Sequence, residues 1–260
     1  MALLIDTHAH LDDNRFDTDR LAMMQRASDG GIVQMIAVGI TVASSRACIR
    51  LVNNRNVFAT VGFHPNEVGD AQSGDWDTIV ALANEPGVVA LGETGIDRFR
   101  DRSPFSTQED YFVRHLELGR KLNRPVVIHA RQADDDIIRL LRIQYDRYGP
   151  ISGVLHSFTG SANTAAAAIS MGLHISIAGM VTYPNAQDVR DMAATIPMNR
   201  LLVETDSPYL SPQPLRGKRN EPSFIIHTAK TLANIFGISL DIIAEHTTHN
   251  ARELFGLPAV

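Results

Sequence analysis

The chain of 260 residues contains a single cysteine, Cys48, so an intramolecular disulfide cannot form. This absence excludes a disulfide-stabilised secreted fold and fits a reducing compartment. No apolar run approaches the roughly 20 residues that cross a membrane. The first ten residues, MALLIDTHAH, also lack the basic start and the apolar stretch of a secretory signal. We therefore expect a cytoplasmic protein that has no membrane partner.

The sequence has no low-complexity segment and no linker rich in Gly, Ser or Pro. The nearest candidate is Ser207–Pro222, which contains four prolines and three basic residues and is interpreted as a long ordered loop. Hydrophobic residues make up 44% of the chain, which is enough to fill a large core and excludes a disordered chain. We expect one domain over residues 1–260, a length typical of a single α/β barrel.

The chain has no excess of positive charge, because 29 acidic residues outnumber 24 basic ones and the formal charge is −5. This balance argues against a protein that coats nucleic acid through a broad basic face. It leaves room for a nuclease, because a local basic rim and metal ions are sufficient to hold a phosphodiester.

Short apolar runs alternate with amphipathic stretches along the whole chain. The runs are short and mostly rich in Val, Ile and Leu, which is typical of strands buried on both faces of a parallel sheet. They are Leu3–Asp6, Ile32–Val38, Val57–Val61, Val88–Leu91, Pro125–His129, Ser152–His156, Leu173–Ala178 and Leu201–Thr205. Helices are predicted over Thr18–Gly30, Thr107–Leu122, Ala133–Tyr145, Asp188–Ile196, Ser223–Phe236 and Ser239–Phe255, the last two completing an outer ring of helices.

Eight strands with intervening helices predict a closed (β/α)₈ barrel, the TIM barrel fold. The alternative is an open doubly wound sheet. It is disfavoured because no predicted strand is followed by a Gly-rich phosphate-binding loop.

Histidines and acidic residues recur where the predicted strands end. They are His8, His10, His64, Glu93, His129, His156 and Asp206. In a parallel barrel these ends emerge at one mouth, where active sites lie. His8 and His10 are two apart, a spacing that directs both imidazoles to the same side of a strand. The pattern predicts a metal site at this mouth.

The ligand types narrow the choice of metal. Imidazole with carboxylate suits Zn, Mn, Fe, Co or Ni, is a poor site for Ca, and leaves Mg open. His64 has three open interpretations: a ligand, a phosphate contact, or a turn residue before Pro65. The other histidines are interpreted as structural or solvent-exposed: His115, His174, His227, His246 and His249.

Several motifs resemble the TatD family of metal-dependent hydrolases, within the larger amidohydrolase-like superfamily. They are IDTHAH (5–10), GFHP (62–65), GETGID (92–97), RPVVIHAR (124–131), GVLHSFTG (153–160), LLVETDSPYL (201–210) and RNEP (219–222). The resemblance extends from end to end of the chain, in the family's order. Arg98 departs from it, because an aromatic residue is common at this position, and we expect this difference to change the mouth of the site.

The resemblance implies a metal-dependent DNase, often a 3′ to 5′ exonuclease, with two divalent metal ions. The ligands carried over are His8, His10, Glu93, His129, His156 and Asp206, with Glu93 bridging the two metals. The expected metals are Mg, Mn or Zn, and the expected substrate is DNA, in single-stranded form.

The residues themselves suggest metal-assisted hydrolysis, with Asp206 and Glu93 as the catalytic carboxylates and Asp206 positioned to orient water or take its proton. The expected substrate contacts are His64, Arg131 and Arg219. Glu204 and Asp6 are predicted behind the ligands, each bonded to the second nitrogen of a ligand imidazole; for Glu204, pairing with a buried Lys or Arg is the alternative. Two other functions stay open: hydrolysis of an amide or ester by the same metals, and an inactive binding or scaffold protein.

Overall fold

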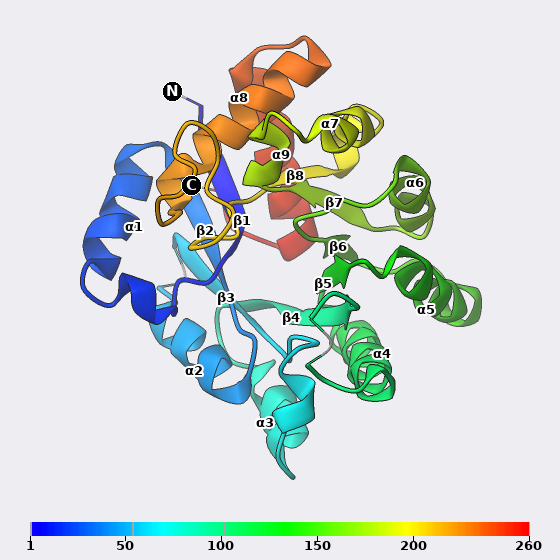
Figure 1. The fold of residues 1–260 in the computed structure, drawn as a ribbon. Helices are drawn as coiled ribbons and strands as arrows, with labels where there is room; N and C mark the ends of the chain where they lie inside the picture. Colours follow the sequence, from blue (N-terminus) through cyan, green and yellow to red (C-terminus); the bar gives the residue numbers. More distant parts are fainter. Residues whose placement is uncertain (1, 54, 101, 260) are drawn as a thin grey trace.

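The computed structural model describes residues 2–53, 55–100 and 102–259. In this part of the chain eight parallel strands lie in sequence order within one sheet. They form a ring in the centre of Figure 1. The strands are β1 (Leu4–Ala9), β2 (Ile32–Val38), β3 (Val57–Val61), β4 (Val88–Asp97), β5 (Val126–Arg131), β6 (Gly153–Leu155), β7 (His174–Ile177) and β8 (Leu201–Val203).

The ring closes where the first strand meets the segment after the last. The backbone N–H of Asp206 donates to the carbonyl of His8 at 2.9 Å, and that of His10 donates to the carbonyl of Ser207 at 2.8 Å. In an open sheet the first strand would not meet the chain after the eighth. The predicted (β/α)₈ barrel is therefore confirmed, and the open doubly wound alternative is excluded.

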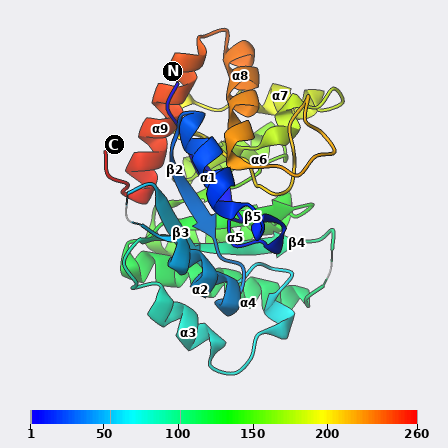
Figure 2. The same ribbon diagram turned by 90° about the vertical axis from the view of Figure 1, so that its left-hand side faces the viewer.

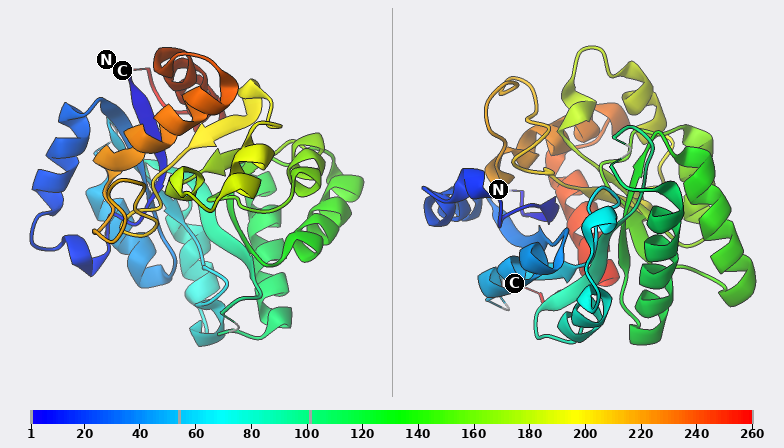
Figure 3. Two further views of the ribbon diagram at one scale, coloured as in Figure 1. Left: turned by 45° about the horizontal axis from the view of Figure 1, so that its top comes forward. Right: turned by 60° about the horizontal axis from the view of Figure 1, so that its bottom comes forward.

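Helices surround the ring in Figure 1, and Figure 3 shows the same arrangement from two other directions. They are α1 (Arg20–Asp29), α2 (Val42–Leu51), α3 (Asp75–Leu82), α4 (Phe105–Leu122), α5 (Asp134–Tyr148), α6 (Ala162–Ser170), α7 (Gln187–Ala193), α8 (Ile225–Phe236) and α9 (Leu240–Phe255). The predicted helices are all present, with shifted ends. None of the described helices is long and apolar enough to cross a membrane.

Helix α4 illustrates how the outer layer packs against the strands. The predicted apolar face is buried and includes Phe112, Leu116 and Gly119. A Cβ atom at position 119 would lie 2.8 Å from the side chain of Val126 and 2.9 Å from the carbonyl of Arg124. Only glycine therefore permits this close approach of α4 to the start of β5.

The barrel interior is filled by one apolar cluster that the last helix helps to form. Ile5, Ile36, Phe58, Val127 and other inward-facing strand residues pack with Phe255, at the end of α9, and with Leu257. Figure 2 shows α9 at the opposite end of the barrel from the loop that follows β8. The C-terminal segment thus does more than complete the outer ring, because it also closes the end of the barrel away from the mouth.

Strand β4 differs most from its predicted extent, because it runs to Asp97 rather than ending at Leu91. Its last six residues include Glu93, Thr94 and Asp97, which interrupt the apolar pattern. All ten residues of the strand are nevertheless buried. Buried polar groups require hydrogen-bond partners. The partners of this strand come from other strands and from α4, so the apolar pattern of the strand itself does not reveal them.

Candidate metal centre

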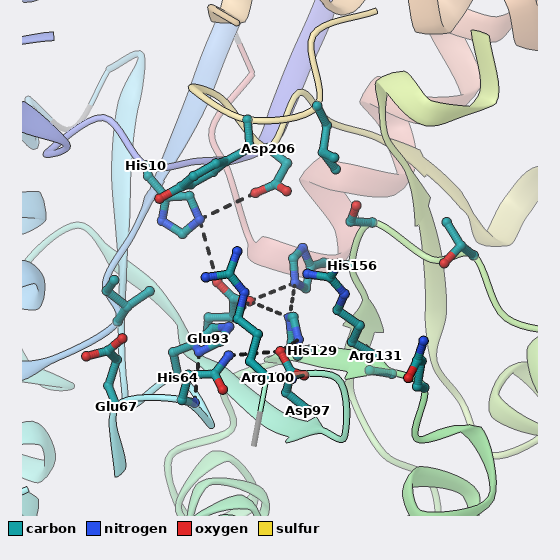
Figure 4. Close-up of a pocket in the computed structure, with 18 of the residues that line it drawn as sticks. His10, His64, Glu67, Glu93, Asp97, Arg100, His129, Arg131, His156 and Asp206 are labelled. Carbon is teal, nitrogen blue, oxygen red and sulfur yellow. Dashed lines mark hydrogen bonds and ion pairs between the residues drawn. The ribbon is translucent and has the colours of Figure 1, made fainter. Parts of the chain in front are cut away.

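The six side chains predicted as metal ligands lie together at one mouth of the barrel. His10, Glu93, His129, His156 and Asp206 line a pocket of about 620 Å³, and Figure 4 shows them directed toward a common centre. His8 is fully buried behind this lining. Strands β1, β4 and β5 carry three of the six, His8, Glu93 and His129. The segments just after β1, β6 and β8 supply His10, His156 and Asp206, so the parallel barrel is what assembles the cluster.

Glu93 is the centre of the cluster, and only 2% of it is exposed. Its Oε1 atom lies 2.8 Å from His156 Nε2 and 2.9 Å from His129 Nδ1. The same oxygen lies 3.3 Å from His64 Nε2. Its other oxygen, Oε2, lies 3.3 Å from His8 Nε2. One carboxylate thus faces imidazoles that come from four different parts of the barrel.

Asp206 faces the two histidines of the first strand region. Its Oδ1 atom lies 3.4 Å from His10 Nε2 and 3.7 Å from His8 Nε2. The backbone of Asp206 is left-handed, with φ at 56°, a conformation that Asp and Asn tolerate better than most residues. The chain therefore leaves the regular strand geometry at Val203 while still directing this carboxylate into the pocket.

In the cluster, buried carboxylates and imidazoles lie close together and shift each other's pKa. Burial alone would raise the pKa of Glu93, but the nearby His156 and His64 outweigh it and hold that pKa well below its usual range. Burial would lower the pKa of His10, yet Asp206 and Glu93 raise it to about 9. Against the effect of burial, the neighbouring histidines lower the pKa of Asp206 as well. The carboxylates of Glu93 and Asp206 are therefore ionised at neutral pH, which is the form that binds a cation.

The arrangement of donor atoms fits a bound metal cation. Two pairs of ring nitrogens face each other closely: His8 Nε2 and His10 Nε2 at 3.4 Å, and His129 Nδ1 and His156 Nε2 at 3.3 Å. Two such lone pairs repel unless a proton or a cation lies with them. Moreover, the buried Glu93 Oε2 has no hydrogen-bond partner among the described residues. Bound cations would provide a partner for these atoms.

The donors fall into three overlapping groups, each within 4.8 Å. The groups are His8 with Glu93 and His156, His8 with His10 and Asp206, and His64 with Glu93 and His129. Because His8 and Glu93 are each shared by two groups, the cluster has more donor atoms than one tetrahedral ion needs. Imidazole and carboxylate together suit Zn or Mn.

Glu204 lies behind the cluster, where the sequence placed it. Its Oε1 atom lies 3.3 Å from Nδ1 of His156, and its side chain is buried. The other nitrogen of the same ring faces Glu93. This is the carboxylate–histidine arrangement that fixes the orientation and tautomer of a metal-ligating imidazole. No Lys or Arg pairs with Glu204 among the described residues.

Asp97 performs the same task for His129, and the sequence analysis assigned it no role. Its Oδ2 atom lies 3.2 Å from His129 Nε2 and accepts a hydrogen bond from Asn66 Nδ2 at 2.8 Å. Asp97 follows Glu93 by four residues on β4, so alternation along the strand puts both on one side. That spacing within the GETGID motif was the available signal.

Asp6 does not make the contact expected of it. Its carboxylate accepts hydrogen bonds from the hydroxyl and the backbone N–H of Thr205, at 2.6 and 2.9 Å, and from the backbone N–H of His8 at 3.3 Å. No imidazole ring contacts it in the described part of the chain. The physical reason is that Asp6 and His8 are neighbours on one strand, and the side chain turns toward β8. Asp6 therefore ties the first strand to the last.

Of the three residues predicted to contact the substrate, two line the pocket and one does not. His64 and Arg131 line the pocket. Arg219 does not: it forms two hydrogen bonds with the carboxylate of Asp19, at 2.7 and 2.8 Å, and is engaged away from the mouth. Arg98, expected to alter the mouth, pairs with Asp136 at 2.9 Å, and its effect on the mouth stays a prediction. Both arginines have an acidic partner that comes from a different segment of the chain.

Comparison with known proteins agrees with this geometry. The sequence model of a family described as "TatD related DNase" matches residues 5–256. The chain belongs to this family. As a TatD protein it is similar along 98% of its length to the "Uncharacterized metal-dependent hydrolase YcfH" of Escherichia coli K12, with 37% identity and 97% of that relative covered.

A second TatD relative carries a more specific name. The "3'-5' ssDNA/RNA exonuclease TatD" of Pantoea ananatis is 33% identical over 98% of this chain and the whole of that protein. Among solved structures, the TatD homologue YJJV from Escherichia coli K12 superimposes with a TM-score of 0.91 and 29% identity, covering 98% of both chains. This TatD protein is thus a member of a family of metal-dependent hydrolases with the barrel fold described above.

Proposed function

We propose that this TatD protein is a metal-dependent deoxyribonuclease that removes nucleotides from the 3′ end of single-stranded DNA. The observation that carries the proposal is the pair of shared donors, His8 and Glu93, at a pocket whose lining includes Arg100 and Arg131. Neither arginine forms an ion pair with a carboxylate among the described residues. The name of the Pantoea ananatis relative, a 3'-5' ssDNA/RNA exonuclease, supports the substrate and the direction.

The proposed ligands of two divalent metals are His8, His10, Glu93, His129, His156 and Asp206. Glu93 is the only one whose two oxygens face imidazoles of different donor groups, Oε1 toward His129 and Oε2 toward His8. This position supports its role as a bridge. Bound divalent metals would polarise a phosphoryl oxygen and lower the pKa of a bound water toward 7.

The protein residues would supply positioning and proton transfer. Asp206 lies at the mouth, 14% exposed, with Oδ1 beside His10 and His8. A carboxylate there can orient the attacking water and accept its proton. Glu204 and Asp97 would hold His156 and His129 in fixed orientations. His64 and Arg131 line the same pocket and would contact the phosphate groups of the substrate.

The proposal is tested by stripping the protein of metal and reconstituting it separately with Mn, Mg or Zn. A 5′-labelled single-stranded oligonucleotide should then be shortened one nucleotide at a time, and a 3′-labelled one should lose its label first. The Asp206→Asn variant, purified in parallel, controls for a contaminating nuclease.

Two results would overturn the proposal. Hydrolysis of p-nitrophenyl acetate or of an amide, without cleavage of any nucleic acid, would make the protein a hydrolase of acyl substrates. Full activity without bound metal would remove the basis of the mechanism. Cleavage from the 5′ end would refute the direction of digestion and leave the nuclease activity standing.

A further inference from the structure

A large aromatic side chain is exposed beside the metal centre. Phe99 follows β4 in the loop that leads to α4, and 55% of it is exposed to solvent. The guanidinium of Arg131 lies over its ring, with Cζ 4.0 Å from the ring centroid. Because Arg131 also lines the pocket, the stacked pair belongs to the rim of the site.

The backbone at Phe99 is held by the carboxylate that also supports the metal centre. Asp97 Oδ1 accepts hydrogen bonds from the backbone N–H groups of Phe99 and Arg100, at 2.8 and 2.9 Å. The other oxygen of Asp97 lies 3.2 Å from His129 Nε2. Asp97 therefore links the backbone at Phe99 directly to the cluster.

Two arginines beside Phe99 have no carboxylate partner among the described residues. Arg100 and Arg131 both line the pocket, and neither guanidinium has an ion pair with a carboxylate in the described part of the chain. Arg98, by contrast, is paired with Asp136. An exposed ring next to two available guanidinium groups matches a nucleobase joined to phosphates, because bases stack on aromatic rings and arginine forks onto phosphate oxygens.

We propose that Phe99, with Arg131 stacked on its ring, forms a stacking platform for the base next to the scissile phosphodiester of single-stranded DNA, with Arg131 and Arg100 contacting phosphates. This inference rests on the proposed nuclease function and adds its strand selectivity. A base must leave the duplex stack before it can lie on Phe99, so the platform favours an unpaired strand.

The test compares Phe99→Ala, Phe99→Trp and Tyr148→Ala with the wild type. Tyr148 is the matched control, because it is another exposed aromatic residue stacked by arginines, and it ends α5 away from the pocket. For each protein, KM and kcat are measured on a single-stranded decathymidylate and on methyl p-nitrophenyl phosphate, a small diester that has no base. Binding of the labelled decathymidylate is also measured by anisotropy in the Asp206→Asn background.

Loss of a base–aromatic stack is expected to raise KM for the oligonucleotide, and its Kd in the Asp206→Asn background, by about 5- to 140-fold. Phe99→Ala should do this while lowering kcat/KM for the small diester much less. Phe99→Trp should bind the oligonucleotide at least as well as the wild type, and Tyr148→Ala should match it.

Unchanged oligonucleotide KM and Kd in Phe99→Ala would overturn the platform, as would an equal loss on both substrates, which indicates a disturbed metal centre. A wild-type protein that cleaves no nucleic acid would instead refute the proposed function itself. The two failures are distinguished by the wild-type activity.

Discussion

Glu93 is a buried side chain that contacts most of the histidines of the site. A carboxylate that is 2% exposed is costly unless it is paired. Its partners here are imidazoles rather than Lys or Arg, and an imidazole can exchange a proton for a metal ion. The same contacts that stabilise the ionised carboxylate therefore create a place for a cation.

The first prediction is that Glu93→Gln lowers the content of both proposed metals. Glutamine keeps the shape of the side chain but removes the charge that faces two donor groups. We expect a loss of affinity beyond the roughly 10–100-fold typical of groups behind the ligands, measured by elemental analysis and calorimetric titration. Glu67→Gln is the control, because Glu67 lines the pocket but belongs to none of the donor groups. Two metals at unchanged occupancy in Glu93→Gln would contradict the bridging role.

The second prediction separates Glu204 from Asp206. Glu204→Gln weakens the support of His156, so metal affinity or activity should fall by about 10–100-fold. Asp206→Asn removes the proposed base, so turnover should fall by about 10²–10⁴-fold, while the remaining donors still hold some metal. Rate and metal content are measured for both variants. A fully active Asp206→Asn variant would refute the proposed mechanism. Wild-type metal affinity and rate in Glu204→Gln would refute the proposed role of Glu204 in orienting His156.

At the scale of elements, a buried histidine helps to join α4 to the part of the barrel that carries the cluster. His115 Nε2 accepts a hydrogen bond from the backbone N–H of Phe63 at 3.2 Å, and its Nδ1 lies 2.6 Å from the carbonyl of Tyr111 and 3.2 Å from Thr94 Oγ1. Phe63 precedes His64, and Thr94 follows Glu93. The sequence analysis interpreted His115 as structural or exposed, and this buried ring has a structural role.

The third prediction concerns pH. Burial lowers the pKa of His115 from 6.5 to about 4, so the folded protein keeps the ring neutral while the unfolded chain takes up a proton. The contribution of neutral His115 to the free energy of unfolding is present above pH 6.5 and is lost as the pH falls from 6.5 to 4. Glutamine does not titrate, so metal-free His115→Gln should lose about 2–3 kcal/mol less stability than the wild type between pH 7 and 4.5.

Urea unfolding of the metal-stripped proteins at both pH values measures this difference. His246→Gln is the control, because His246 lies exposed on α9. Equal loss of stability in the wild type and in His115→Gln would show that the ring is not held neutral by the fold.

At the scale of the whole molecule, the proposed metal site joins strands from both sides of the barrel. The proposed ligands lie on β1, β4 and β5 and just after β1, β6 and β8, and they are separated by up to 198 positions, between His8 and Asp206. A ligand that binds only the folded state stabilises it by mass action. Metal binding at this place should therefore stabilise the barrel as a unit.

The fourth prediction is that removing metal with EDTA lowers Tm, and that adding it back restores Tm. A metal present at 100 times its Kd contributes about 2.7 kcal/mol, which corresponds to roughly 5–10 °C for a chain of this size. Differential scanning calorimetry measures the shift. Glu93→Gln should respond much less to EDTA, and an equal response in this variant would place the stabilising metal elsewhere.

Local patterns determined much of the architecture. The strands Ile32–Val38 and Val57–Val61 have the predicted ends, because each is a mostly apolar run bounded by polar or turn residues. Since all strands of a parallel barrel end at one mouth, the position of each His or acid in the chain was enough to predict their convergence. The motifs were enough to indicate the family.

Other features depend on partners that are remote in sequence. The pairing of Arg219 with Asp19, of Arg98 with Asp136 and of Asp97 with His129 joins residues from different loops or strands. A sequence shows that a side chain is charged, but the free energy of pairing depends on distance and burial, which exist only after folding. The sequence alone therefore determined which residues reach the mouth, and the tertiary structure decided which of them face the pocket and which are held by a neighbour.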